Sequence, residues 1–251
     1  MNTDAAARPP RTVLITGGSS GIGLASARHF RAAGDRVVII ARNRERLDRV
    51  VRDLGVAGYS ADCADVGALS RVRDHVGQVD ILIHGAGALR ARRFRRQSLE
   101  AFESTVRANL STAYGAVAAF VPSMAVGGRI IFVSSTAGVD AGTFMSAYAA
   151  SKAAVRMMAA SIRAELEADG IAVHVVLPGT VDTEMMEITE IERAALNPED
   201  VVSAIAWLAD LPTRVRVDEI IMRPAESSPF THVISPGTAT AAASARREVA
   251  S

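Results

Sequence analysis

Short apolar runs rich in β-branched residues recur along the chain, separated by longer stretches whose apolar residues follow helical spacing. Runs of the first kind predict buried strands, and the stretches between them predict helices. The predicted strands are 12–16, 37–41, 81–84, 129–134 and 172–177, with 215–222 as the last. The predicted helices are 23–33, 44–54, 66–76, 99–120, 147–168 and 198–209.

The predicted strands neither alternate in polarity nor meet in two-residue turns, so crossover connections must join them. This pattern predicts an α/β fold, a doubly wound parallel sheet (Rossmann) of about seven strands with helices on both faces. We expect a single catalytic domain over 11–235, because such folds often form one unit of ~200–250 residues. We expect residues 1–10 to be a flexible lead-in and residues 236–251 a disordered tail with little to bury.

The composition is that of a globular protein, with 49% apolar and 22% charged residues. Lys and Arg together number 28 against 27 Asp and Glu, which gives no electrostatic reason to expect nucleic acid or an anionic membrane as partner. No apolar run approaches the ~18 residues that span a bilayer. The single cysteine, Cys63, has no Cys or His neighbour at metal-ligand spacing, so we expect no metal site and a cytoplasmic protein.

A glycine-rich turn joins the first predicted strand to the first predicted helix, with the sequence Thr16-Gly17-Gly18-Ser19-Ser20-Gly21-Ile22-Gly23. In a parallel sheet this junction presents the amides of a helix N-terminus to a phosphate. A tight turn also needs glycine for conformational reasons alone. Leu24 follows the turn, so the Lys and Ser/Thr of a P-loop are missing and an ATP or GTP hydrolase is not indicated.

Four polar residues are candidates for catalysis. Tyr148 and Lys152 are four residues apart in a helical segment and share one helix face, where the Lys152 ammonium should lower the tyrosine pKa from ~10. Ser135 ends an apolar strand thirteen residues before Tyr148. Asn109 lies in the predicted helix 99–120, where asparagine is an indifferent helix former. A Tyr-x-x-x-Lys pair alone is also common as a purely structural feature.

The turn has the form Thr-Gly-x-x-x-Gly-x-Gly, and together with the Asn, Ser, Tyr and Lys set the sequence resembles the classical short-chain dehydrogenase/reductase family from about Arg11 to Pro224. The resemblance implies an NAD(P)-dependent oxidoreductase that interconverts a small-molecule carbonyl and an alcohol. It implies that Tyr148 is the general acid/base, that Lys152 holds the nicotinamide ribose, that Ser135 steadies the substrate oxygen and that Asn109 anchors a proton-relay water. It also implies a homodimer or homotetramer formed through the helices 99–120 and 147–168.

Arg42 stands at the end of the second strand, where an acidic residue would bind a ribose 2′-hydroxyl. A guanidinium pairs with phosphate, so Arg42 favours NADP(H) over NAD(H), unless it simply belongs to a solvated charged stretch. Asp62 matches the family position beside the adenine, although a helix cap is an alternative that Asp65 fulfils better. The cofactor-binding residues that the resemblance implies are Gly17, Ser19, Ser20, Gly21, Ile22, Gly23, Arg42, Asp62, Cys63, His84, Ala86, Gly87, Tyr148, Lys152, Pro178, Gly179, Val181 and Thr183.

His84 begins the segment His84-Gly85-Ala86-Gly87, which departs from the usual Asn-Asn-Ala-Gly of the family. It could cap the strand or pack in the core, and we expect no catalytic role for it.

The substrate side of the site is less determined. The segment 184–196, where the family has a lid, is short and predicts an open pocket. Candidate pocket residues are Met185, Met186, Ile188, Phe144 and Met145, although methionines at such spacing are often ordinary packing. The ending of the last strand resembles that of family members acting on small hydroxy acids.

A basic cluster follows the predicted strand 81–84 and is formed by Arg90, Arg92, Arg93, Arg95 and Arg96. It would suit an acidic substrate or a carrier protein, or it is a solvated loop. Two other functions remain open for the whole chain: a non-catalytic dinucleotide-binding sensor or scaffold, and an enzyme of the same fold that catalyses isomerisation or dehydration.

Overall fold

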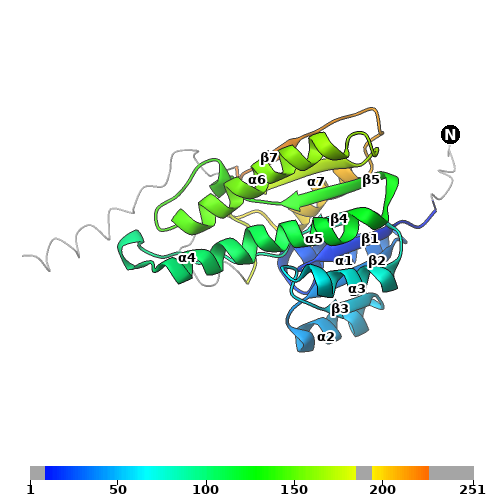
Figure 1. The fold of residues 1–251 in the computed structure, drawn as a ribbon, viewed down its shortest axis with the longest axis horizontal. Helices are drawn as coiled ribbons and strands as arrows, with labels where there is room; N and C mark the ends of the chain where they lie inside the picture. The colour runs from blue at the N-terminus through cyan, green and yellow to red at the C-terminus, as the bar shows by residue number, and fades with distance from the viewer. Residues whose placement is uncertain (1–8, 185–193, 226–251) are drawn as a thin grey trace, which may run out of the picture.

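Seven parallel strands form one sheet in the order β3-β2-β1-β4-β5-β6-β7, as seen in a computed structural model that describes residues 9–184 and 194–225 (Figure 1). The strands are β1 (Thr12–Thr16), β2 (Arg36–Ala41), β3 (Ala57–Ser60), β4 (Val79–His84), β5 (Met124–Val133), β6 (Ala172–Pro178) and β7 (Glu219–Met222). The strand order reverses direction between β1 and β4, which is where doubly wound sheets bind their ligands. The predicted fold class is confirmed.

Helices cover both faces of this sheet (Figure 1). They are α1 (Gly21–Ala32), α2 (Arg44–Leu54), α3 (Val66–Val76), α4 (Leu99–Val106), α5 (Thr112–Phe120), α6 (Ser146–Leu166) and α7 (Pro198–Ala209). Successive strand residues point to opposite faces, so Leu14 joins the core under α3, α5 and α6, whereas Val13 and Ile15 join the core under α1, α2 and α7. Both cores are fully apolar in their centres, which accounts for the continuous apolar runs of the strands.

Local signals fix the start of three helices. The side chains of Asn43, Asp65 and Ser98 each accept a hydrogen bond from a backbone N–H in the first turn of α2, α3 and α4, which satisfies an otherwise unpaired donor. Helix α2 ends at Gly55, whose φ of 61° is the left-handed conformation that glycine adopts without strain. The prediction that Asp65, and not Asp62, caps the third helix is confirmed.

The structure corrects three predicted boundaries. The predicted helix 99–120 is interrupted by a π-helical turn (Arg107–Ser111) between α4 and α5. Strand β5 begins at Met124, earlier than expected, and β7 begins only at Glu219. The lead-in 1–8, the lid residues 185–193 and the tail from 226 lie outside the described residues, so predictions on them, including Met185, Met186 and Ile188, stay predictions.

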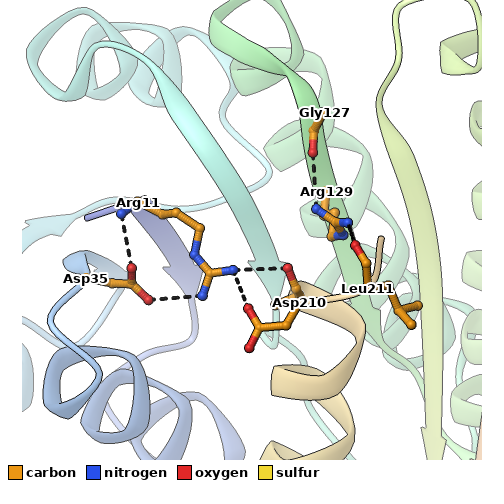
Figure 2. A network of polar contacts seen from close by, with 7 residues as sticks. Arg11, Asp35, Gly127, Arg129, Asp210 and Leu211 are labelled. Carbon is orange, nitrogen blue, oxygen red and sulfur yellow. Dashed lines mark hydrogen bonds and ion pairs between the residues drawn. The ribbon is translucent and has the colours of Figure 1, made fainter. Parts of the chain in front are cut away.

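The amino ends of the strands carry a network of charged side chains (Figure 2). Arg11 donates to the buried carboxylate of Asp35 at 3.2 Å and to Asp210 at 2.6 Å, just after α7. Arg129, near the start of β5, donates to the carbonyls of Gly127 and Leu211. These contacts connect β1, β5 and the end of α7 at the amino end of the sheet, opposite the cavity described below.

Candidate active site

A cavity of about 260 Å³ opens at the carboxyl ends of the strands. Side chains and backbone from the ends of β1, β4, β5 and β6 meet there with α1, α6 and the π turn. Fifteen predicted site residues line it: Gly17, Ser20, Gly21, Ile22, Gly23, Ala86, Gly87, Asn109, Ser135, Tyr148, Lys152, Pro178, Gly179, Val181 and Thr183. All four candidate catalytic residues are therefore brought together.

Helix α6 presents Tyr148 and Lys152 to this cavity. The two side chains are 9% and 7% exposed, and the Lys152 Nζ lies 5.7 Å from the centre of the Tyr148 ring. Lys152 Nζ donates to the carbonyl of Val133 at 3.1 Å, which leaves two of its three donors for other groups. Lys152 is also the only lysine in the sequence, and all other long basic side chains are arginine. The presence of a single lysine is a further sequence signal for a special role of this residue.

Burial dominates the ionisation of the pair. It raises the pKa of Tyr148, an effect that a hydrogen bond with Ser135 only partly counters. It lowers the pKa of Lys152 to about 8. The prediction that the ammonium lowers the pKa of Tyr148 is therefore wrong for this structure, because the desolvation of a phenolate outweighs its neighbours. At neutral pH the tyrosine is a protonated phenol and the lysine an ammonium.

Two serines at the end of β5 support this arrangement. Ser134 Oγ donates to the carbonyl of Lys152 at 3.1 Å, which ties the strand to the catalytic face of α6. Ser135 Oγ accepts from the N–H of Ala137 at 3.1 Å, which orients the hydroxyl at the cavity beside Tyr148.

Asn109 occupies the π turn, and its amide contacts the segment that follows β4. Its Nδ2 donates to the carbonyls of Ala88 and Thr105, both at 3.0 Å, and its Oδ1 accepts from the N–H of Ala88 at 3.1 Å. A Cβ on Gly87 would lie 2.6 Å from the Asn109 Oδ1, so this position admits only glycine without a shift. The role of Asn109 in holding a water stays a prediction, and its observed contacts fix the cavity wall.

The N-terminus of α1 is open toward the cavity. Its N-cap residue Ser20 makes no side-chain capping bond, and the first turn contains no acidic residue. The free N–H groups and the positive end of the helix dipole fit an anion such as a pyrophosphate. The glycines of the turn serve packing: a Cβ on Gly17 or Gly23 would collide with backbone at 2.8 or 2.3 Å.

Five predicted cofactor residues do not line the cavity: Ser19, Arg42, Asp62, Cys63 and His84. Arg42 is exposed just after β2. The pKa of the Asp62 carboxyl is lowered mainly by the hydrogen bond from the Ala64 N–H, then by Arg107, and least by Arg42. Asp62 itself accepts from Ala64 N and from Arg107. The Cys63 thiol is buried in the core, which raises its pKa to about 12.

His84 is fully buried beneath the site. Its Nδ1 lies 2.8 Å from the Thr16 Oγ1, and burial lowers its pKa to about 3, so it is a neutral packed residue. Several lining residues were not singled out from the sequence: Gly85, Ala88, Leu89, Val133, Ser134, Thr136, Ala137, Asp140, Gly142, Thr180 and Glu184. All lie at the carboxyl end of β4, β5 or β6 or in the segment that follows it, which is the signal that could have found them.

The fold is that of a dinucleotide-binding oxidoreductase, and a Ser, Tyr, Lys and Asn set lines its cavity. The chain matches the family model for short chain dehydrogenases over residues 11–193, and it belongs to the short-chain dehydrogenase/reductase family. It is an NAD(P)-dependent oxidoreductase acting on CH–OH and C=O groups. No helix in the described part of the chain is both long and apolar enough to cross a membrane.

Relatives and solved structures agree with this family. An uncharacterized oxidoreductase from Staphylococcus haemolyticus is 30% identical over 85% of this chain and 97% of its own. The 3-oxoacyl-[acyl-carrier-protein] reductase MabA of Mycobacterium bovis is 34% identical over 81% and 88%. The structure of BdcA in complex with NADPH superposes with a TM-score of 0.78 at 29% identity, covering 88% of this chain and 96% of that one.

Proposed function

We propose that this protein is an NADP(H)-dependent carbonyl reductase in which Tyr148 is the proton donor. The observation that carries the proposal is the protonated, buried phenol of Tyr148 beside an ammonium and Ser135 in one cavity. A phenol with a raised pKa stays protonated at neutral pH, so it can give its proton to an oxygen that becomes negative. The nicotinamide would supply the hydride when bound.

The other residues bind and orient. The free amides of α1 and the glycine turn hold an anionic pyrophosphate, and Lys152 offers its two remaining donors to ribose hydroxyls. Ser135 offers its hydroxyl to the substrate oxygen at the point where the proton of Tyr148 is delivered. Asn109 keeps the wall from Gly87 to Ala88 in place.

Arg42 supports the choice of NADP(H). Its guanidinium is exposed at the end of β2, and within the described residues no carboxylate lies at ion-pair distance from it. The relative BdcA and a short chain dehydrogenase from Burkholderia cenocepacia have structures in complex with NADPH and NADP, respectively. A free guanidinium at this strand end would pair with a 2′-phosphate.

Two variants test the proposal, with fluorescence titration of NADPH and NADH and a screen of ketones, aldehydes and hydroxy acids. Tyr148→Phe should reduce kcat by about 10²- to 10⁴-fold, with a much smaller change in cofactor affinity, whereas Tyr59→Phe on β3 should behave as wild type. Arg42→Ala should weaken NADPH binding by about 10-fold and leave NADH unchanged, with Arg52→Ala as control. Full turnover in Tyr148→Phe refutes the mechanism, and cofactor binding without turnover in the wild type indicates a sensor.

We also propose that the protein pairs through α4, α5 and α6. Leu99, Tyr114 and Met157 on these helices are 66%, 59% and 70% exposed, although each is large and apolar or aromatic. Large exposed apolar side chains gathered on neighbouring helices are typical of subunit interfaces. Light scattering at micromolar concentration should give a dimer or tetramer mass, and a monomer mass contradicts the proposal.

A further inference from the structure

Five arginines in the segment between β4 and α4 form no ion pair with any described residue. Arg90, Arg92, Arg93, Arg95 and Arg96 are all exposed, and none pairs with a carboxylate in the described part of the chain. Five guanidiniums within seven residues repel one another, because neighbouring charges on one loop lie within a Debye length of about 10 Å. An anion bound among them would relieve this repulsion.

The cluster adjoins the mouth of the active-site cavity. Leu89, which precedes the first arginine, lines the cavity, and so does Met145, which packs against the same small apolar cluster. The N–H of Arg92 donates to the carbonyl of Phe144 at 2.8 Å, and the Arg93 guanidinium lies over the Phe144 ring, 5.3 Å from its centre. Two of the five arginines are therefore attached to the rim of the cavity through one aromatic residue.

Phe144 holds an unusual conformation that fixes this rim. Its φ of 66° makes it the one non-glycine residue with positive φ among those described. Such a backbone is unfavourable for a bulky residue and persists where surrounding contacts hold it. The Arg93 guanidinium is planar and carries five N–H donors, and within the described residues its side chain makes no hydrogen bond, so these donors are available to a carboxylate or phosphate.

We propose that the substrate carries a carboxylate or phosphate remote from its carbonyl, and that Arg92 and Arg93 receive this anionic group at the rim. The inference rests on the proposed reductase function, whose site lies on the inner side of the same rim. The ligand is a free small molecule, because the chain as a whole has a net charge of only +1, which gives no general attraction to a polyanionic partner.

Matched probes that differ only in charge test this inference. The probes are linear oxo acids of increasing chain length with their methyl esters, and dihydroxyacetone phosphate with dihydroxyacetone. Binding is measured by calorimetry to the protein alone and with saturating NADP⁺, and turnover by the consumption of NADPH. The variant is Arg92→Gln/Arg93→Gln, and the matched control is Arg49→Gln/Arg52→Gln, two exposed arginines of α2 far from the rim.

The wild type and the control should favour an anionic probe over its neutral partner by about 10- to 100-fold in affinity and in kcat/KM. The Arg92→Gln/Arg93→Gln variant should lose this preference and keep kcat/KM on the neutral probe. Equal affinity for every acid and its neutral partner in the wild type overturns the inference. Binding of heparin or nucleic acid that depends on Arg92 and Arg93, without discrimination among the small probes, overturns it in favour of a macromolecular partner.

The binding and turnover measurements distinguish this inference from the proposed function. Anion-selective binding without reduction of any probe contradicts the reductase function and supports the anion site. Reduction of acids and esters at equal rates supports the reductase function and contradicts the anion site.

Discussion

Buried charged side chains are paired differently at the two ends of the parallel sheet. At the amino end Arg11 contacts two carboxylates, and Asp35 is fully buried against it (Figure 2). At the carboxyl end Lys152 is just as buried, yet no carboxylate pairs with it in the described part of the chain, and a single carbonyl accepts from it. The chain pairs its buried Asp35 with a cation at one end and, within the described residues, leaves the buried ammonium of Lys152 without a carboxylate at the other.

The helices that follow β1, β2, β3 and β4 all begin at the carboxyl end of the sheet, and their N-termini differ in capping. Helices α2, α3 and α4 have side-chain caps, whereas α1, which points at the cavity, has none. Unpaired donors cost stability in the free protein, and they persist where a ligand is their partner. We infer that the amino end of the sheet contributes stability and the carboxyl end contributes binding and catalysis.

The largest effect is expected from breaking the neutralised pair. Asp35→Asn should lower the free energy of unfolding by about 3 kcal/mol, the lower part of the range for a broken buried pair, because Arg11 retains Asp210. Denaturant unfolding measures this loss. The kcat of the remaining folded protein should not change, and a loss of activity without a loss of stability would contradict the division between the two ends.

The uncompensated ammonium predicts an unusual dependence of stability on pH. The folded pKa of Lys152 is about 8, below its ordinary value of 10.5. Between these values Lys152 binds more protons in the unfolded chain than in the folded one, so its contribution to stability should rise with pH from 8 to 10.5, by at most ~1.4 kcal/mol per pH unit. Above about pH 9 the buried Cys63 thiol, whose pKa is raised to about 12, acts in the opposite direction. Below pH 8 this contribution is fully absent.

Urea unfolding of wild type and Lys152→Met across this range isolates the contribution, since the variant lacks the titrating group. Because Lys152 is the only lysine of the chain, lysine-selective isotope labelling gives a single side-chain signal whose titration reports the pKa directly. A midpoint near 10.5 would show that the ammonium is compensated after all.

Local signals explain which parts of the fold could be predicted from the sequence. Helix α2 was predicted at its observed bounds, because Asn43 caps one end and Gly55 ends the other. The π turn was missed because nothing in residues 107–111 demands it. It accompanies the contacts between Asn109 and Ala88, which the chain makes only once β4 and the helix are packed together.

In the site too, local sequence signals predict residue positions, whereas properties that depend on the folded cavity could not be predicted. The positions of Ser135, Tyr148 and Lys152 followed from motif spacing and strand ends, and the structure brings them together. The ionisation of Tyr148 could not be predicted, because it depends on how much water the folded cavity removes from the phenol. The link between Arg92 and Phe144 likewise depends on two loops meeting in space.

A capping residue introduced at the N-terminus of α1, which has no side-chain cap, tests the comparison between capped and uncapped helices. Ser20→Asp should cap α1 and complement its dipole, which stabilises the free protein by about 0.5–1 kcal/mol. The same carboxylate should compete with a pyrophosphate and weaken NADPH binding by about 10-fold. Ser98→Asp is the control, because α4 already has a side-chain cap and lies outside the phosphate site. Thermal unfolding and fluorescence titration measure both effects, and unchanged NADPH affinity in Ser20→Asp would show that these amides bind no phosphate.

The smallest expected effect shows whether burial or contact distance decides how much each carboxylate paired with Arg11 contributes to stability. Arg11 lies closer to Asp210 than to Asp35, at 2.6 against 3.2 Å, but the Asp210 carboxylate is 60% exposed whereas that of Asp35 is fully buried. If burial decides the contribution, Asp210→Ala should cost less than ~1 kcal/mol, and the cost should shrink in high salt because solvent ions screen an exposed pair. Denaturant unfolding at low and high salt tests this. A loss as large as that of Asp35→Asn, insensitive to salt, would mean that distance rather than desolvation determines what each carboxylate contributes.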